Sequence, residues 1–130
     1  MTAVREVLER DGRIAYALVF GSAARGTAHV HSDLDVAIGV VPGVSLTTAE
    51  LGTLLADLER AAGRRVDLVL LHDAPPGLAY RIFRDGVTLF ERDHRAYAGR
   101  KAQAILDYLD FRPTEELLAR GALAAAARGR

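Results

Sequence analysis

Asp33 and Asp35, two aspartates separated by one residue, are the strongest sign of chemistry in this 130-residue sequence. They open a run of alternating apolar residues that predicts a strand over 33–41. Side chains at i and i+2 of a strand point to the same face, so these carboxylates would lie about 6–7 Å apart along the chain. Two ionised carboxylates about 5 Å apart repel each other by roughly 3 kcal/mol at an effective dielectric constant near 20. A divalent cation between them removes this penalty, and Mg²⁺ prefers such hard oxygen ligands.

A third carboxylate is expected beside this pair. Asp67 is the one polar residue within the sequence VDLVLL, and this segment predicts a strand over 65–71. The helix predicted between Thr47 and Gly63 returns the chain to the sheet, so the two acidic strands can be neighbours with their aspartates on one face. Three carboxylates on one sheet face form a site for two magnesium ions about 3.5–4 Å apart, which clamp an in-line phosphoryl displacement.

A phosphate site is predicted next to these acids. The apolar strand predicted over 14–20 stops at Gly21 and Ser22, and ten residues separate Ser22 from Asp33. A glycine at a strand end lets backbone amides approach a phosphate closely, and a serine hydroxyl can donate to a phosphate oxygen. Arg25 could add a charge-assisted contact, either to a phosphate or to a neighbouring carboxylate.

Purely structural roles for the acids stay open at this point. Asp33 and Asp35 could form a solvated strand start or a loop cap. Asp67 could be an edge-strand charge that pairs with Arg64 or Arg65.

His29 and His31 form an H-x-H pattern that could suggest zinc. Both lie in a predicted loop with no third nitrogen ligand nearby, and the chain has no cysteine. We therefore expect these two histidines to face solvent.

Composition indicates one globular domain with one core, because 50% of the residues are hydrophobic and 26% are charged. The formal net charge is zero, which argues against direct nucleic-acid binding by neutralisation of the phosphate backbone. The N-terminal segment is charged and helical, unlike a signal sequence, and no apolar run is long enough to span a bilayer. We expect no membrane association and a cytoplasmic location.

Hydrophobic periodicity predicts the secondary structure. Helices are expected over 3–10, 48–62, 77–84 and 93–110, and strands over 14–20, 33–41, 65–71 and 87–90. Thr47 and Glu50 form a capping box for the second helix, and Gly63 suits its end.

The C-terminal part is predicted as two helices. The helix over 93–110 carries one stripe of Ala98, Ala102, Ile105 and Leu109 and a neighbouring stripe of Tyr97, Lys101, Ala104 and Tyr108. Pro113 is expected to interrupt it, before a last helix over 115–127 that Thr114 can cap.

The combined pattern resembles the DNA polymerase beta-like nucleotidyltransferase superfamily, specifically its minimal branch, the MNT domains. The family pattern is Gly-Ser at a strand end, then D-x-D on the next strand, then a third acid on a later strand. The residues that carry it here are Gly21, Ser22, Asp33, Asp35 and Asp67, and the fuller form, GS-x-x-RG with SD-x-D, adds Arg25, Gly26 and Ser32.

The resemblance implies an α/β (α+β) fold. This fold is a small mixed β-sheet of four strands with helices packed on one side, followed by C-terminal helices. It also implies a single minimal nucleotidyltransferase domain over 1–130, with a core over 1–91 and a helical extension over 92–130.

The same resemblance implies the reaction and the roles of the residues. Asp33 and Asp35 would hold two magnesium ions, while Asp67 would bind the catalytic ion and help to activate the attacking hydroxyl. Gly21 and Ser22 would hold the triphosphate of ATP. The reaction transfers AMP to a hydroxyl and releases pyrophosphate.

The small size resembles the MntA-type antitoxins of HEPN/MNT toxin–antitoxin systems. This implies a HEPN-domain ribonuclease toxin as the partner in a hetero-oligomeric complex, with one of its tyrosines as the AMP acceptor. Two alternatives stay open: an antitoxin that acts by binding alone, and a transferase for a small-molecule hydroxyl such as that of an aminoglycoside. The second alternative needs an acceptor pocket that the short helical tail is not expected to build.

Overall fold

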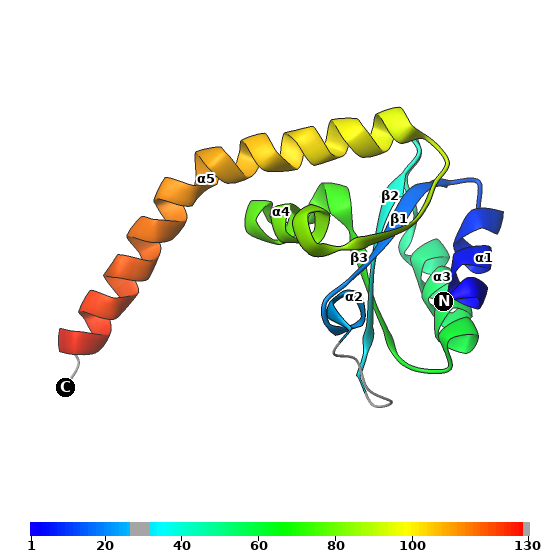
Figure 1. Ribbon diagram of the computed structural model, residues 1–130, viewed down its shortest axis with the longest axis horizontal. Helices are drawn as coiled ribbons and strands as arrows, with labels where there is room; N and C mark the ends of the chain where they lie inside the picture. The colour runs from blue at the N-terminus through cyan, green and yellow to red at the C-terminus, as the bar shows by residue number, and fades with distance from the viewer. Residues whose placement is uncertain (27–31, 129–130) are drawn as a thin grey trace.

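A four-stranded sheet forms the centre of the computed structural model, which describes residues 1–26 and 32–128. Its order is β3-β2-β1-β4, with β1 (Ile14–Phe20), β2 (Leu34–Val40), β3 (Val66–Leu70) and β4 (Val87–Glu91) (Figure 1). β1 runs antiparallel to β2 and to β4, whereas β2 and β3 are parallel. The predicted mixed sheet is therefore confirmed.

Helices precede and connect these strands. In the described residues they are α1 (Thr2–Arg10), α2 (Ser22–Arg25), α3 (Thr48–Ala62), the short 3₁₀ helix η1 (Leu71–Asp73), α4 (Pro76–Asp85) and α5 (His94–Arg128). The elements predicted up to β4 begin and end within one residue of these bounds. Among the described helices, none has both the length and the apolar character that a bilayer span requires.

The helices cover both faces of the sheet, so the expectation that they pack on one side is wrong. On one face, Leu8 of α1 and Leu58 of α3 pack against Val36 of β2. On the other face, Ile82 of α4 and Ala104 of α5 belong to a second buried cluster. The physical reason is that β1 and β2 are apolar on both sides, and each side must be removed from water.

The connection through α3 makes β2 and β3 parallel neighbours. Thr47 Oγ1 accepts the backbone N–H of Glu50 at 3.1 Å, and Glu50 Oε1 accepts the backbone N–H of Thr47 at 2.9 Å. Gly63 ends the helix in the left-handed conformation, with φ +68°. The predicted capping box and terminal glycine are confirmed, and together they set where the chain leaves the sheet and where it returns.

α5 is one helix, and the predicted break into two helices is wrong. It runs from His94 to Arg128 with Pro113 inside it, and Figure 1 shows it bending midway and leading away from the sheet. A proline inside a helix removes one backbone hydrogen bond and crowds the preceding turn, which bends the helix without ending it when strong helix formers flank it.

The buried stripe of α5 is the one that contains Ala104. Ala104 is fully buried, whereas Ile105 and Leu109 of the more apolar stripe are 38% and 51% exposed. The contact with α4 explains this orientation, because Tyr108 stacks on Tyr80 with 4.2 Å between ring centroids. Aromatic packing between the helices therefore leaves the leucine-containing face of α5 in solvent.

Candidate active site at the shared end of three strands

Strand pairing brings the predicted site residues from three strands to one end of the sheet. In the ladder, Asp35 of β2 lies opposite Phe20 of β1 and also opposite Asp67 of β3. Gly21 follows Phe20 directly, and Asp33 stands immediately before β2. Neighbouring strands lie about 4.8 Å apart, so Asp35 stands between the glycine loop and Asp67.

The two paired aspartates face away from α1 and α3. Val36 of β2 and Val66 of β3 are buried in the α1/α3 core, and adjacent residues on a strand point to opposite faces. Asp35 and Asp67 therefore share the other face, as predicted. Asp35 is partly buried and Asp67 is exposed, which makes Asp67 the more accessible of the two from solvent.

Gly21 touches Asp35 so closely that no side chain fits between them. A Cβ atom built on Gly21 would lie 2.2 Å from Asp35 Oδ2. Its backbone angles, φ +70° and ψ −145°, also belong to a region that residues other than glycine rarely adopt. The close contact with Asp35 and the unusual backbone angles therefore each require glycine at position 21. The close contact also places the backbone of the loop against the carboxylate.

The chain makes one tight helical turn after Gly21. The backbone N–H of Arg25 donates to the Gly21 carbonyl oxygen at 3.2 Å. Gly26 ends this turn in the left-handed conformation, with φ +71°. Ser22 is the first residue of α2 and directly follows the glycine that lies against Asp35.

Like charges surround Asp35 at the acidic cluster. Burial raises the pKa of the Asp35 carboxyl above its usual value, and the negative charges of Asp67 and Asp33 raise it further. Arg25 acts in the opposite direction. Like charges beside a partly buried carboxylate favour the binding of a cation.

Arg25 lies within electrostatic reach of a second acid. The pKa of Asp85, at the end of α4, is lowered mainly by the side-chain hydrogen bond from Arg84, and the charge of Arg25 adds to this effect. Arg25 thus interacts with both Asp35 and Asp85, and it remains exposed. Its position agrees with either predicted role, as a partner of a carboxylate or of a phosphate.

The donors fit magnesium by chemistry, but they do not form a closed cage. Within residues 1–26 and 32–128, no three His, Cys, Asp or Glu side chains lie close enough together to hold a metal ion. Carboxylate oxygens are nonetheless the ligands that Mg²⁺ prefers, and repulsion between ionised carboxylates favours an open arrangement. The charges of Asp67 and Asp33 both act on Asp35 and raise its pKa.

The H-x-H pattern of His29 and His31 lies outside the described residues. The expectation that these histidines face solvent therefore stays a prediction.

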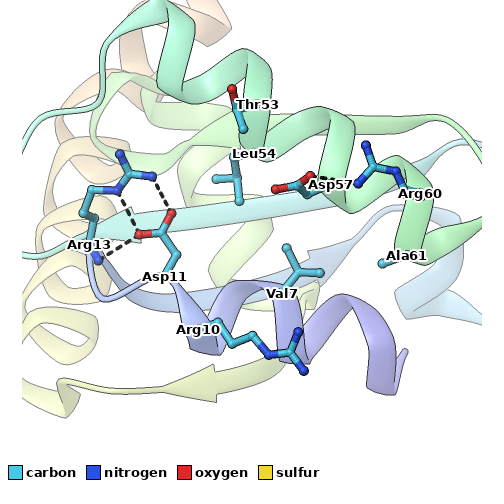
Figure 2. A pocket seen from close by; sticks show the side chains of 9 residues that line it. All are labelled: Val7, Arg10, Asp11, Arg13, Thr53, Leu54, Asp57, Arg60 and Ala61. Carbon is cyan, nitrogen blue, oxygen red and sulfur yellow. Dashed lines mark hydrogen bonds and ion pairs between the residues drawn. The ribbon is translucent and has the colours of Figure 1, made fainter.

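Sequence reasoning did not predict a groove between α1 and α3, shown in Figure 2. Its volume is about 470 Å³, and it lies on the face of the sheet opposite Asp35. Its charged side chains are already paired: Arg13 contacts Asp11 at 2.7 Å, and Arg60 contacts Asp57 at 3.2 Å. Compensated charge of this kind indicates a structural role.

Residues 2–95 match the family model described as polymerase beta, nucleotidyltransferase. The match spans well over half of the chain and includes every predicted site residue, so the chain belongs to this family.

Several solved structures share this fold. One chain of a toxin–antitoxin complex with AMP-PNP has a TM-score of 0.80 and 22% identity, with 94% of this chain and 97% of that chain covered. A tri-AMPylated Shewanella oneidensis HEPN toxin in complex with an MNT antitoxin gives a TM-score of 0.73 at 18% identity, with coverages of 94% and 97%. A candidate minimal nucleotidyltransferase gives 0.57 at 32% identity, with coverages of 66% and 85%. The comparison with curated proteins returned no match.

Proposed function

We propose that this protein is a magnesium-dependent nucleotidyltransferase that moves AMP from ATP to a hydroxyl of a HEPN-type toxin and thereby neutralises it. The observation that carries the proposal is the alignment of Gly21, which directly follows β1, with Asp35 of β2 and Asp67 of β3 at one end of the sheet. This arrangement lies within the segment that matches the nucleotidyltransferase family. It brings the proposed phosphate-binding loop next to the acidic cluster, and nucleotidyl transfer requires both.

The nature of the acceptor is supported by the structural neighbours. One neighbour is a toxin–antitoxin complex with AMP-PNP, and another contains a HEPN toxin that carries three AMP groups. Both cover 94% of this chain and 97% of their own, so the likeness extends over nearly the whole molecule. We extend their nucleotide and their kind of partner to this protein on that basis.

Each site residue has a proposed role in the reaction. Asp33, Asp35 and Asp67 would hold two magnesium ions, which when bound neutralise charge that develops on the phosphates. Gly21, through its backbone, and Ser22, through its hydroxyl, would bind the triphosphate.

Asp67 is exposed at the edge of the sheet and would help to take the proton from the acceptor hydroxyl. The acceptor oxygen then bonds to the α-phosphorus of ATP. The bond from this phosphorus to the bridging oxygen breaks, and pyrophosphate leaves.

The domain organisation is part of the same proposal. We place the catalytic core at residues 1–91 and treat 92–130 as a helical extension of a single domain. The first half of α5 packs on α4, while Leu117 and Leu118 in the second half are 68% and 64% exposed. An exposed apolar helix of this kind suits contact with a partner protein.

The decisive test is AMP transfer to a HEPN-family protein co-encoded with this chain. Both proteins are incubated with ATP and Mg²⁺, and the intact mass of the partner is measured. We expect a gain of one or more AMP units, together with loss of the partner's nuclease activity. No mass gain while the nuclease is silenced would refute transfer and support inhibition by contact.

Neutralisation by binding alone is the second candidate. The open arrangement of the acids and the exposed leucines of α5 favour it. Asp33→Ala separates the two: protection is lost if transfer neutralises the toxin and is kept if contact is sufficient.

A further inference from the structure

Arg65 is an exposed cation directly before β3, at the end of the sheet that carries the acidic cluster. The Leu34 N–H donates to the Arg65 carbonyl oxygen at 2.9 Å, and Leu34 pairs with Val66. The parallel register of β2 and β3 therefore continues one residue before β3, where it sets Arg65 opposite Asp33. Strand pairing thus places this arginine beside the proposed site.

Two observations direct the Arg65 side chain to the face of the sheet that carries Asp67. Arg65 precedes Asp67 by two residues, and residues two apart on an extended segment point to the same face. Val66, between them, is buried in the core under α1 and α3. Arg64 lines a hollow with residues of α1 and α3 and therefore lies on the opposite side from Asp67.

The guanidinium of Arg65 has no partner within the described residues, 1–26 and 32–128. It forms neither a hydrogen bond nor an ion pair there, although Asp67 lies two residues along the chain. The pairing of Asp67 with Arg65 that the sequence left open is therefore not formed. By contrast, Arg13 and Arg60 are both paired with carboxylates. The N–H donors of Arg65 are thus available to a ligand on the face of Asp67.

The order of the strands indicates which part of ATP Arg65 meets. β1 and the glycine loop lie on one side of Asp35, and β3 with Asp67 lies on the other. In the proposed reaction the loop holds the triphosphate, and Asp67 helps to take the proton from the acceptor hydroxyl. The α-phosphorus must lie between them, because the acceptor oxygen bonds to it as pyrophosphate leaves. Arg65 stands on the Asp67 side, so its nearest phosphate is the α-phosphate.

We infer that Arg65 binds a non-bridging oxygen of the α-phosphate of ATP and is a further catalytic residue of the reaction, an inference that rests on the proposed transfer of AMP. A guanidinium presents its N–H donors in a planar fork that matches phosphate oxygens. Arg25 follows the loop on the other side of Asp35, so two cations would flank the triphosphate. Because the α-phosphate is the group transferred, this contact acts mainly on kcat.

Arg65→Ala tests this contact, with Arg64→Ala as the matched control. Both variants lose one guanidinium at neighbouring positions, but Arg64 lies on the opposite face. With a co-encoded HEPN-family protein as acceptor, Arg65→Ala should lower kcat for AMP transfer at least about tenfold. Arg64→Ala should stay within a factor of about two of the unaltered protein. Equal kcat values for the two variants, once urea unfolding has verified that both fold, would overturn the inference.

Restoring the positive charge separates a phosphate contact from a structural role. Guanidinium ion, added far below the concentrations that unfold proteins, should restore part of the kcat lost in Arg65→Ala. Arg65→Lys should have an intermediate kcat, because lysine keeps the charge but not the planar fork. Rescue by neither the ion nor lysine would contradict the inference. A higher KM for the acceptor with kcat unchanged would also contradict it and assign Arg65 to acceptor binding.

ATP binding without an acceptor separates failure of this inference from failure of the proposed function. Calorimetric titration with ATP and Mg²⁺ should give a Kd several-fold higher for Arg65→Ala than for the unaltered protein, and an unchanged Kd for Arg64→Ala. If the unaltered protein binds ATP but transfers no AMP, the proposed reaction fails, and Arg65 is judged by this titration alone. Equal Kd values for Arg65→Ala and the unaltered protein would then refute the phosphate contact.

Discussion

Two acidic clusters in this molecule show opposite electrostatic behaviour. In the groove of Figure 2, Arg13 donates to Asp11 at 2.8 and 2.7 Å and also contacts Glu50. The hydrogen bond from Arg13 holds the pKa of Asp11 below its ordinary value. At the sheet end, burial and the neighbouring carboxylates raise the pKa of Asp35.

This electrostatic difference distinguishes a cluster that stabilises the fold from one for which we propose a function. Around Arg13, opposite charges join the start of β1 to the start of α3 and stabilise the fold. At Asp35, like charges are held together against their own repulsion by strand pairing. An external cation or substrate can supply the missing charge in such an arrangement, which supports the proposal that the chemistry occurs at this end of the sheet.

Asp35→Asn is the substitution with the largest expected effect, and it tests the functional role of the cluster at the sheet end. We expect AMP transfer to fall by at least about 10³-fold, because the central carboxylate of the cluster is lost. The free protein should be as stable as before or more stable, since repulsion is relieved. Transfer is followed by intact mass and stability by urea unfolding. The control is Asp57→Asn, on the exposed surface of α3, which should retain full transfer.

ATP with Mg²⁺ should stabilise the folded protein through the Asp35 cluster and not through the cluster around Arg13. A hundredfold excess of ATP with Mg²⁺ over Kd should raise the free energy of unfolding by about 2.7 kcal/mol. Asp35→Asn should abolish this increase, and Arg13→Gln should preserve it. Differential scanning fluorimetry measures both. If Asp35→Asn keeps the stabilisation by ATP and Mg²⁺, the nucleotide binds elsewhere. The proposed functional role of the Asp35 cluster would then be wrong.

Gly21→Ala tests the contact between the loop and the acid. A methyl group would collide with Asp35 Oδ2 at a backbone conformation with φ +70°. We expect a loss of about 1–3 kcal/mol in stability, together with loss of transfer. Gly43→Ala is the control, because Gly43 has φ +83° but open space around its Cβ position. This control should lose stability only, and full transfer by Gly21→Ala would disprove the proposed phosphate loop.

Arg13→Gln tests whether the charge cluster around Arg13 has a structural role only. Removing the guanidinium leaves Asp11 and Glu50 without their shared partner, so the free energy of unfolding at neutral pH should fall. AMP transfer should stay within a factor of about two, because the cluster lies on the opposite face from Asp35. Chemical denaturation and the mass assay check the two effects separately. A large loss of transfer would show that the two clusters are coupled.

The pH dependence of stability should have opposite signs at the two clusters. The pKa of Asp11 is lowered in the folded protein, so its contribution is present above the unfolded pKa and is lost as the pH falls through the folded pKa. The pKa of Asp35 is raised, so its contribution is present below the unfolded pKa and is lost as the pH rises through the folded pKa. Asp11→Asn should therefore destabilise at pH 7 and have less effect near pH 3.

Asp35→Asn should show the reverse sign, with stabilisation at pH 7 that disappears near pH 3. Urea unfolding of both variants at the two pH values measures the effect. The same sign for both would contradict the electrostatic assignment.

Local patterns in the sequence were sufficient for the core of the fold. The alternation after Asp33 predicted β2, and the capping box of Thr47 and Glu50 with Gly63 predicted α3. These signals are local because backbone conformation, capping and turn chemistry depend on near neighbours. The pattern also predicted that Gly21, Asp35 and Asp67 meet, and they do because β2 begins where the antiparallel β1 ends and the parallel β3 begins beside β2.

Only the tertiary structure decided the features that depend on distant packing. Helices cover both faces of the sheet, and α5 turns Ala104 inwards and Leu109 outwards because Tyr108 stacks on Tyr80. α5 also continues through Pro113. The groove between α1 and α3 and the contact of Arg13 with Glu50 likewise join segments far apart in the chain. Local sequence periodicity does not predict such contacts, because they contribute to stability only after distant elements have packed together.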